Sequence, residues 1–128
     1  MSFQEKSIKS EKVAKLSYER ELYDSSINRY YYSFFQFLKH ILKVNEIHID
    51  QNEINKAGSH DKAVSEYIGY LRAKGIKQFP KITKINKCYS EMKQFRKKAD
   101  YWEEESSKED VDRFERSYNE LKKILSQK

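Results

Sequence analysis

The stretch NRYYYSFFQFLKHIL, residues 28–42, holds three consecutive tyrosines and three phenylalanines in a chain otherwise rich in Lys, Glu and Ser. Apolar residues at steps of three and four define one helical face, made of Ile27, Tyr31, Phe34, Phe35, Leu38, Ile41 and Leu42, which Tyr30 and Phe37 widen. Such an arc is wider than one packing partner requires. The pattern predicts a helix at the centre of a helical bundle, or one that a second subunit covers.

The composition is compatible with one folded domain spanning residues 1–128. Charged residues make up 36% of the chain, hydrophobic residues only 38%, and the mean hydropathy is −1.00, values close to those of disordered chains. Aromatic residues nevertheless make up 14%, and large rings bury much area per residue. We therefore expect a small core that is rich in aromatic side chains.

Regular apolar spacing predicts further helices, and no stretch alternates as a strand would. The helices are expected over Val64–Leu71, Ile82–Trp102 and Val111–Leu125, with Ser59 and Ser107 as N-caps, and a weaker one over Glu5–Tyr23. That weaker helix rests on Ile8, Val13, Leu16 and Leu22, and YDSS at 23–26 is expected to separate it from the aromatic helix, with Ser25 or Ser26 as cap. Residues 45–58 are expected to form an irregular connection. The predicted fold class is an all-α, four- to five-helix up-and-down bundle.

Several classes of protein are disfavoured. The chain has one cysteine, Cys88, so neither an internal disulfide nor a cysteine-based zinc site is expected. No apolar run has membrane-spanning length, and MSFQEKSIKSEK at the N-terminus lacks the hydrophobic region of a signal peptide. Neither a Gly-rich phosphate loop nor a metal-ligand cluster is evident. We expect a soluble, cytoplasmic protein without metal or cofactor.

Charge is distributed unevenly in a chain with a net charge of +6. Between Lys81 and Lys98 seven basic residues face one acidic residue, Glu91, whereas acidic residues dominate from Asp100 to Glu120. A basic stripe beside an acidic one can steer an anionic ligand such as RNA. Charge runs of this kind also occur as ordinary solvated helix faces.

Three segments together resemble the HEPN superfamily, above all its small stand-alone prokaryotic members. They are SSINRYYYSFFQFLKHIL at 25–42, GSHDKAVSEYI at 58–68 and YSEMKQFRKKADYW at 89–102. Within them the motif-like parts lie at Asn28–Phe34, Ser59–Lys62 and Arg96–Tyr101, and the likeness extends in order over roughly residues 10–125.

The resemblance implies a dimeric helical bundle from a toxin–antitoxin or anti-phage system, often paired with a small nucleotidyltransferase. Many HEPN proteins are metal-independent ribonucleases with an arginine followed by four to six residues and a histidine. In that chemistry the histidine moves the ribose 2′-OH proton and the arginine stabilises charge on the phosphate. Here none of the arginines is followed by a histidine at that distance: the permitted positions after Arg96 hold Tyr101, Trp102 and Glu103.

Arg96 and Asp100 are four residues apart and therefore share a helix face, with Tyr101 adjacent. The pair is either an exposed ion pair or part of a binding site in which Asp100 and Tyr101 support Arg96. The resemblance aligns Arg96 with a family arginine, which makes it a candidate catalytic and RNA-binding residue. A role for Tyr101 as a target of a nucleotidyltransferase is a further alternative.

Other basic side chains are candidates for contacts to RNA. Arg29 is placed to meet either a phosphate or a carboxylate of another helix, such as that of Asp100. His60 follows a predicted N-cap, where the helix dipole disfavours a protonated ring, so it is a candidate base as well as a packing or capping residue. Additional phosphate contacts are expected from Lys93, Lys97 and Lys98 if these side chains are not simply solvated.

The tyrosine run has a structural interpretation as well. Tyr30, Tyr31, Tyr32 and Phe34 are expected to serve the core and a subunit contact together, because a covered tyrosine can bury its ring and keep its hydroxyl hydrogen-bonded. Two functions are thus predicted. One is an RNA-directed HEPN protein, possessing ribonuclease activity only if its site is non-standard. The other is a non-catalytic helical module that docks a nucleotidyltransferase or another defence partner.

Overall fold

A computed structural model describes residues 1–48 and 58–127. These residues form α1 (Phe3–Glu19), α2 (Tyr23–Val44), α4 (Ser59–Ala73), a short 3-10 helix (Ile76–Gln78), α5 (Phe79–Tyr101) and α6 (Lys108–Leu125). No strand occurs among them, so the all-α class is confirmed for this part of the chain. Of the predicted connection at 45–58, residues 49–57 lie outside the described ranges.

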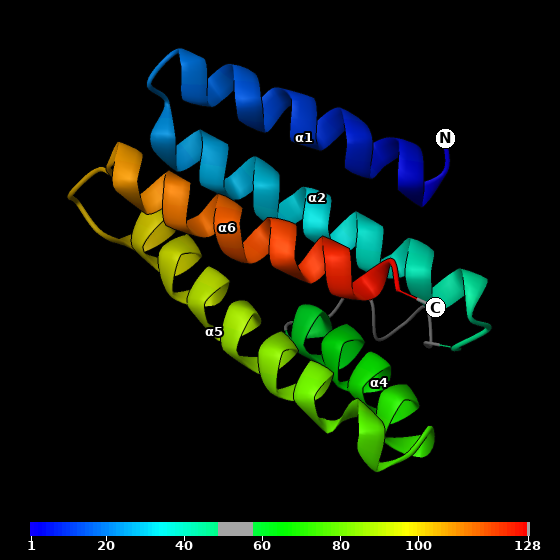
Figure 1. Ribbon diagram of the computed structural model, residues 1–128. Helices are drawn as coiled ribbons and strands as arrows, with labels where there is room; N and C mark the ends of the chain where they lie inside the picture. Colours follow the sequence, from blue (N-terminus) through cyan, green and yellow to red (C-terminus); the bar gives the residue numbers. More distant parts are fainter. Residues whose placement is uncertain (49–57, 128) are drawn as a thin grey trace.

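Helix α2 is the element that the others share. It contacts α1, α4, α5 and α6, and in Figure 1 α1 and α6 run alongside it while α5 and α4 lie below. Its wide aromatic arc is buried, with Tyr30, Tyr31 and Phe34 between 1% and 4% exposed. Of the two expected alternatives, the contacts of α2 with four helices of the same chain agree with a central position. Tyr32, in contrast, is 43% exposed and does not belong to the core.

One buried apolar cluster joins the helices. Its largest fully buried members are Tyr30, Tyr118, Phe114, Ile27, Leu38, Met92, Leu121 and Val111. The predicted apolar faces of α4 and α6 and most of that of α5 lie in this cluster, but Trp102, expected to end the face of α5, is 62% exposed beyond the helix.

The prediction for the first helix was wrong in its buried face. Ile8, Val13, Leu16 and Leu22 are 43–53% exposed, whereas α1 buries Ser7, Ser10, Ala14 and Ser17 against α2. Small side chains allow two helices to approach closely, and the serine hydroxyls then bond across the gap. Ser7 Oγ donates to the carbonyl of Ser33 at 2.8 Å, and Ser26 Oγ donates to the carbonyl of Ala14 at 2.8 Å.

Two of the predicted caps were also wrong. Ser25 and Ser26 lie inside α2, which begins at Tyr23, and Ser26 is buried against α1 instead of capping. At α4 the N-cap is Gly58 with φ 84°, a left-handed conformation that suits glycine, and Ser59 is the first helical residue. The N-cap predicted at Ser107 is confirmed, in a capping box with Asp110.

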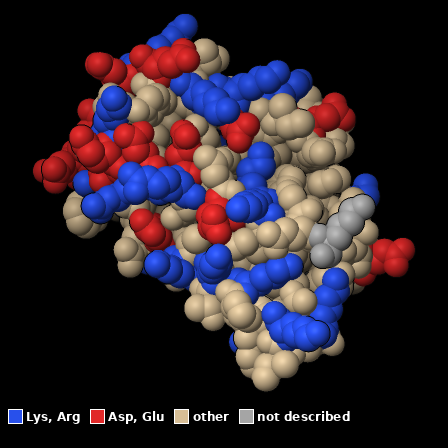
Figure 2. All heavy atoms as spheres, in the orientation of Figure 1, with Lys and Arg blue, Asp and Glu red and all other residues tan. Residues whose placement is uncertain are grey.

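The predicted charge stripes are interleaved in space. Lys84 pairs with Glu120 at 3.8 Å and Lys98 with Asp110 at 2.8 Å. Carboxylates of α6 therefore neutralise part of the positive charge of α5. Figure 2 shows the face on which α6 lies, where acidic side chains gather near the junction of α5 and α6 and basic ones lie among them and towards the other end of α5. Among the described residues, no helix is both long and apolar enough to cross a membrane.

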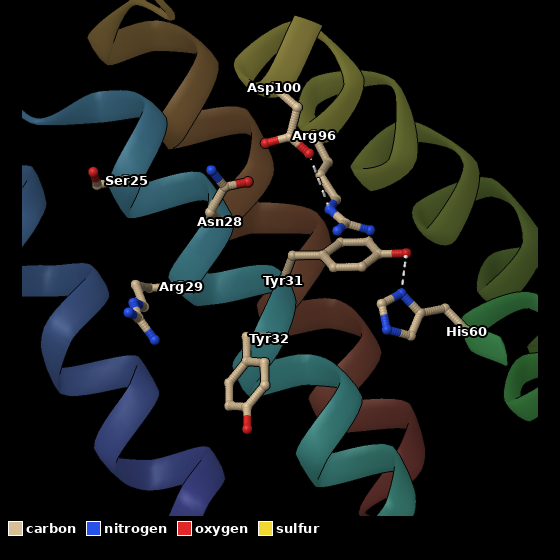
Figure 3. Close-up of a pocket in the computed structure, with 8 residues that line it drawn as sticks. All are labelled: Ser25, Asn28, Arg29, Tyr31, Tyr32, His60, Arg96 and Asp100. Atoms are coloured by element: carbon tan, nitrogen blue, oxygen red, sulfur yellow. Dashed lines mark hydrogen bonds and ion pairs between the residues drawn. The ribbon is translucent and has the colours of Figure 1, made fainter. Parts of the chain in front are cut away.

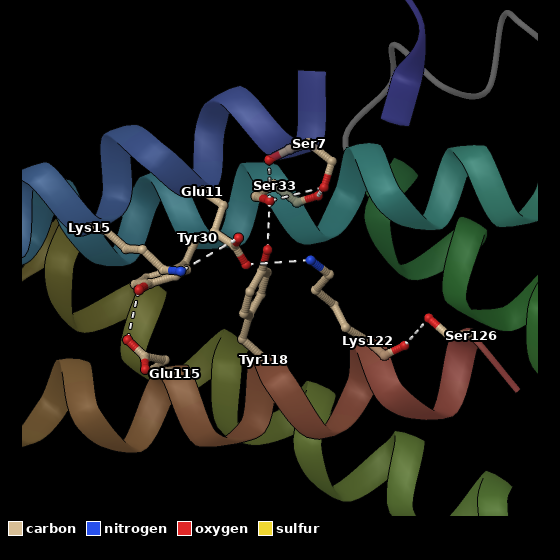
Figure 4. Close-up of polar contacts among 9 residues, drawn as sticks. All are labelled: Ser7, Glu11, Lys15, Tyr30, Ser33, Glu115, Tyr118, Lys122 and Ser126. Carbon is tan, nitrogen blue, oxygen red and sulfur yellow. Dashed lines mark hydrogen bonds and ion pairs between the residues drawn. The ribbon is translucent and has the colours of Figure 1, made fainter. Parts of the chain in front are cut away.

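The Ser33 hydroxyl connects three helices and offers a test of this packing. It lies 2.7 Å from the Ser7 carbonyl on α1 and 2.7 Å from the Tyr118 hydroxyl on α6 (Figure 4). Ser33→Val removes both bonds and leaves the buried Tyr118 hydroxyl without this partner. We expect a loss of about 1–3 kcal/mol in the free energy of unfolding, measured by urea denaturation.

The matched control is Ser65→Val, which makes the same change at an exposed position within α4. Equal losses for the two variants would show that helix propensity, and not the interhelical bonds, accounts for the effect.

Candidate functional site

Three adjoining depressions lie where α2, α4 and α5 meet, and all three are lined by Tyr31 and Arg96. Their volumes are about 370, 310 and 150 Å³. We call them together the Tyr31 hollow. Its lining residues are Ser25, Asn28, Arg29, Tyr31, Tyr32, Gly58, Ser59, His60, Asp61, Tyr89, Lys93, Arg96, Lys97, Asp100 and Tyr101.

Arg96 occupies the middle of the hollow. Its guanidinium carbon lies 4.4 Å from the centre of the Tyr31 ring, a cation–π distance. Its Nε is 3.5 Å from Asp100 Oδ2, as the four-residue spacing predicted (Figure 3). No described carboxylate pairs with the Nη groups, and the side chain is 40% exposed. Two directional donors of this kind suit the oxygens of a phosphate or carboxylate.

Arg29 lies at another edge of the hollow. Its side chain leaves α2 on the side that faces α1, away from Arg96, and is exposed (Figure 3). Asp100, which the sequence offered as a partner of Arg29, pairs with Arg96 instead, and among the described residues Arg29 forms no ion pair. The two arginines therefore border the same hollow from different helices without sharing a carboxylate.

His60 extends from the first turn of α4 against α2. Its Nδ1 lies 3.2 Å from the Tyr31 hydroxyl, and its ring centre is 3.9 Å from that of Phe35. Burial, together with the charges of Arg96 and Lys39 and against that of Asp61, lowers the pKa of His60 from 6.5 to about 4. The ring is consequently neutral at pH 7, where it can accept a proton but has none to give as an imidazolium.

A chain of polar groups continues from Tyr31 into α5 and α4. The hydroxyls of Tyr31 and Tyr89 are 3.4 Å apart, and the Tyr89 hydroxyl donates to Asp61 Oδ1 at 2.7 Å. Lys93 Nζ binds the same oxygen at 2.9 Å. Bonds from Lys93 and then Tyr89 lower the pKa of Asp61, whereas burial is the largest cause of the raised pKa of Tyr89. Asp61 is therefore ionised and Tyr89 keeps its proton at neutral pH.

The hollow carries more positive than negative charge. Its lining contains two carboxylates, Asp61 and Asp100, which are paired with Lys93 and Arg96 respectively. Its cations number four: Arg29, Lys93, Arg96 and Lys97. An anion entering the hollow would thus meet unneutralised donors. Among the described residues no group of three or more His, Cys, Asp or Glu side chains is arranged to hold a metal ion.

The structure brings together most of the residues that the sequence singled out. Arg29, His60, Lys93, Arg96, Lys97, Asp100 and Tyr101 all line the Tyr31 hollow. Lys98 does not: it points to Asp110 and lies 5.8 Å from the centre of the Trp102 ring. Sequence reasoning missed Asp61 and Tyr89, and it assigned Tyr31 to the core and a subunit contact, although Tyr31 lines the hollow. The position of Asp61 directly after His60 was the one feature of the sequence that could have indicated a place for it in the hollow.

Comparison with family models, curated proteins and solved structures gave no match. Membership of the HEPN superfamily therefore remains a prediction from the sequence motifs.

The neutral state of His60 makes stability depend on pH. Its pKa is about 4 in the folded chain and 6.5 for an unperturbed histidine, so the unfolded state takes up the proton first as the pH falls. We expect the free energy of unfolding to drop by about 1–3 kcal/mol between pH 6.5 and 4 through this residue alone. Urea denaturation at a series of pH values measures it.

Carboxylates also titrate in this range, so the informative quantity is the difference between wild type and His60→Gln. The variant should lose this part of the pH dependence, while His48→Gln, at an exposed position, should keep it. Identical pH profiles for wild type and His60→Gln would show that His60 is not held neutral.

Proposed function

We propose that the Tyr31 hollow binds the phosphate groups of RNA. The observation that carries this proposal is the placement of Arg96 and Arg29 from two helices around one hollow, with Lys93 and Lys97 beside Arg96. Phosphate contacts from Arg and Lys supply most of the affinity of proteins for nucleic acids. Exposed aromatic rings also border the hollow, since Tyr32 is 43% and Tyr101 82% exposed. Unpaired bases stack on such rings.

The sequence likeness gives this activity a biological setting. We propose that the chain is a HEPN-type protein of a prokaryotic toxin–antitoxin or anti-phage system, with an up-and-down helical bundle that dimerises. The motif-like segments Asn28–Phe34, Ser59–Lys62 and Arg96–Tyr101 support this, because each of them contributes side chains to the hollow. Analytical ultracentrifugation tests the dimer, which would have twice the monomer mass of 15.5 kDa. A monomer at all concentrations would refute the proposed dimer.

Binding of a labelled single-stranded RNA, followed by fluorescence anisotropy over a range of salt concentrations, tests the phosphate site. We expect Arg96→Gln and Arg29→Gln each to weaken binding roughly tenfold and to reduce the slope of log affinity against log salt by about one. The reason is that each variant removes one charge-assisted phosphate contact.

The matched control is Arg116→Gln, at an exposed position on α6 and outside the hollow. If Arg116→Gln weakened binding as much as the hollow variants, the effect would be one of net charge. The Tyr31 hollow would then not be the RNA site.

A second candidate function is a non-catalytic one, the docking of a nucleotidyltransferase or another defence partner. It is favoured by the absence of the Arg–His spacing of HEPN ribonucleases and by the low pKa of His60, about 4. An efficient general base has a pKa near the working pH, and a neutral ring cannot act as the acid that protonates the leaving group. Partner docking and RNA binding are compatible, because neither requires cleavage.

Incubation with cellular RNA in EDTA separates binding from cleavage. We expect the RNA to remain intact, because the hollow provides a weak base and no matching acid. Cleavage that persists in EDTA and disappears in both His60→Ala and Arg96→Ala would contradict this expectation. It would establish a metal-independent ribonuclease with a non-standard site.

A further inference from the structure

We infer that Asp61, Tyr89 and Tyr31 form a directed hydrogen-bond chain that fixes His60 as the Nδ1–H tautomer and leaves Nε2 as an acceptor for a ligand hydroxyl. The inference deepens the proposed function, since the hydroxyl would be the ribose 2′-OH of RNA bound in the hollow. The chain itself is a property of the free protein and can be tested without RNA.

The direction of the chain follows from its ionised end. Asp61 is an acceptor only, so the hydroxyl of Tyr89, 2.7 Å from Oδ1, must donate its single proton to the carboxylate. Lys93, 2.9 Å from the same oxygen, holds Asp61 in its ionised state. Tyr89 consequently presents only lone pairs to the next group in the chain.

The next group is Tyr31. Its hydroxyl oxygen lies 3.4 Å from that of Tyr89, and two oxygens that both offer lone pairs at this distance would repel each other. Donation from Tyr31 towards Tyr89 removes this repulsion. Having used its proton there, Tyr31 presents a lone pair to His60 Nδ1, 3.2 Å away. Nδ1 must then carry the hydrogen, and Nε2 has none.

The position of Nε2 suits an incoming ligand. Figure 3 shows this nitrogen on the side of the imidazole ring away from the Tyr31 hydroxyl. His60 lines the two larger depressions of the hollow, and no described residue forms a hydrogen bond with Nε2. A neutral Nε2 with a lone pair accepts a hydrogen bond from a hydroxyl, whereas DNA offers no 2′-OH at the same place. Asp61, Tyr89 and Tyr31 would be positioning residues in this arrangement.

Nitrogen NMR of the imidazole rings in labelled, RNA-free protein at neutral pH tests the chain. The three histidines are assigned by comparison with His60→Gln. We expect His60 to show a protonated Nδ1 and an unprotonated Nε2, the reverse of the tautomer that free histidine prefers. In Tyr89→Phe, Tyr31 loses its acceptor and donates to Nδ1 instead, so the proton should move to Nε2.

Tyr70→Phe is the matched control, because it removes a hydroxyl from α4 that bonds Asn45 and not His60. It should leave the His60 signals unchanged. A wild-type His60 protonated at Nε2 would overturn the inference, and this holds even if Tyr89→Phe does not fold. An unchanged tautomer in folded Tyr89→Phe would overturn it as well.

A second readout concerns the ligand. If Nε2 accepts the 2′-OH, the ratio of RNA to DNA affinity for one sequence should fall roughly fivefold in Tyr89→Phe and stay unchanged in Tyr70→Phe. An unchanged ratio in both variants would overturn the role of Nε2 in recognition. Failure of the wild-type protein to bind RNA would instead overturn the proposed function while the tautomer result stood.

Discussion

The requirement that a buried tyrosine hydroxyl find a hydrogen-bond partner organises this chain. Tyr30 on α2 donates to Glu115 on α6 at 2.7 Å, and Tyr118 on α6 meets Ser33 on α2 at 2.7 Å. Tyr89 on α5 reaches Asp61 on α4. Each bond connects two helices at a point where aromatic rings supply the burial, so a weakly hydrophobic chain obtains both packing and register from the same residues. Burial is also the largest cause of the raised pKa of Tyr30, which keeps that hydroxyl a donor.

The need of a buried tyrosine hydroxyl for a hydrogen-bond partner also shapes the Tyr31 hollow. The Tyr31 ring packs in the core at 4% exposure, while its hydroxyl meets His60 and its face meets Arg96. A single side chain therefore belongs to the core and to the site. Tyr31 and Phe35 of α2 both contact His60 in the first turn of α4, and Tyr31 also contacts Arg96 of α5.

Apolar spacing predicted α4, α5 and α6 well, because each buries large side chains at steps of three and four. It failed for α1, where the contact with α2 is made by Ser7, Ser10, Ala14 and Ser17. A face of small polar residues has no hydrophobic signature, and its stability depends on a close approach that only the partner helix reveals. In the site, the sequence identified the charged residues and His60. It could not identify Tyr31 or Tyr89, because their aromatic rings satisfy the pattern of a core helix and conceal the role of their hydroxyls.

In the Tyr31 hollow, the residues proposed to bind an anion are not the main cause of the low pKa of His60. The proposed affinity for an anion would depend on Arg96 and its neighbouring cations, which remain in place whatever the protonation of His60. The low pKa of His60 arises first from burial and only then from Arg96 and Lys39. A bound phosphate would offset part of the second cause and none of the first, so it would not by itself make His60 an effective base. If the Tyr31 hollow binds RNA as proposed, it would hold a phosphate and accept a hydrogen bond from a neighbouring hydroxyl without cleaving the RNA chain.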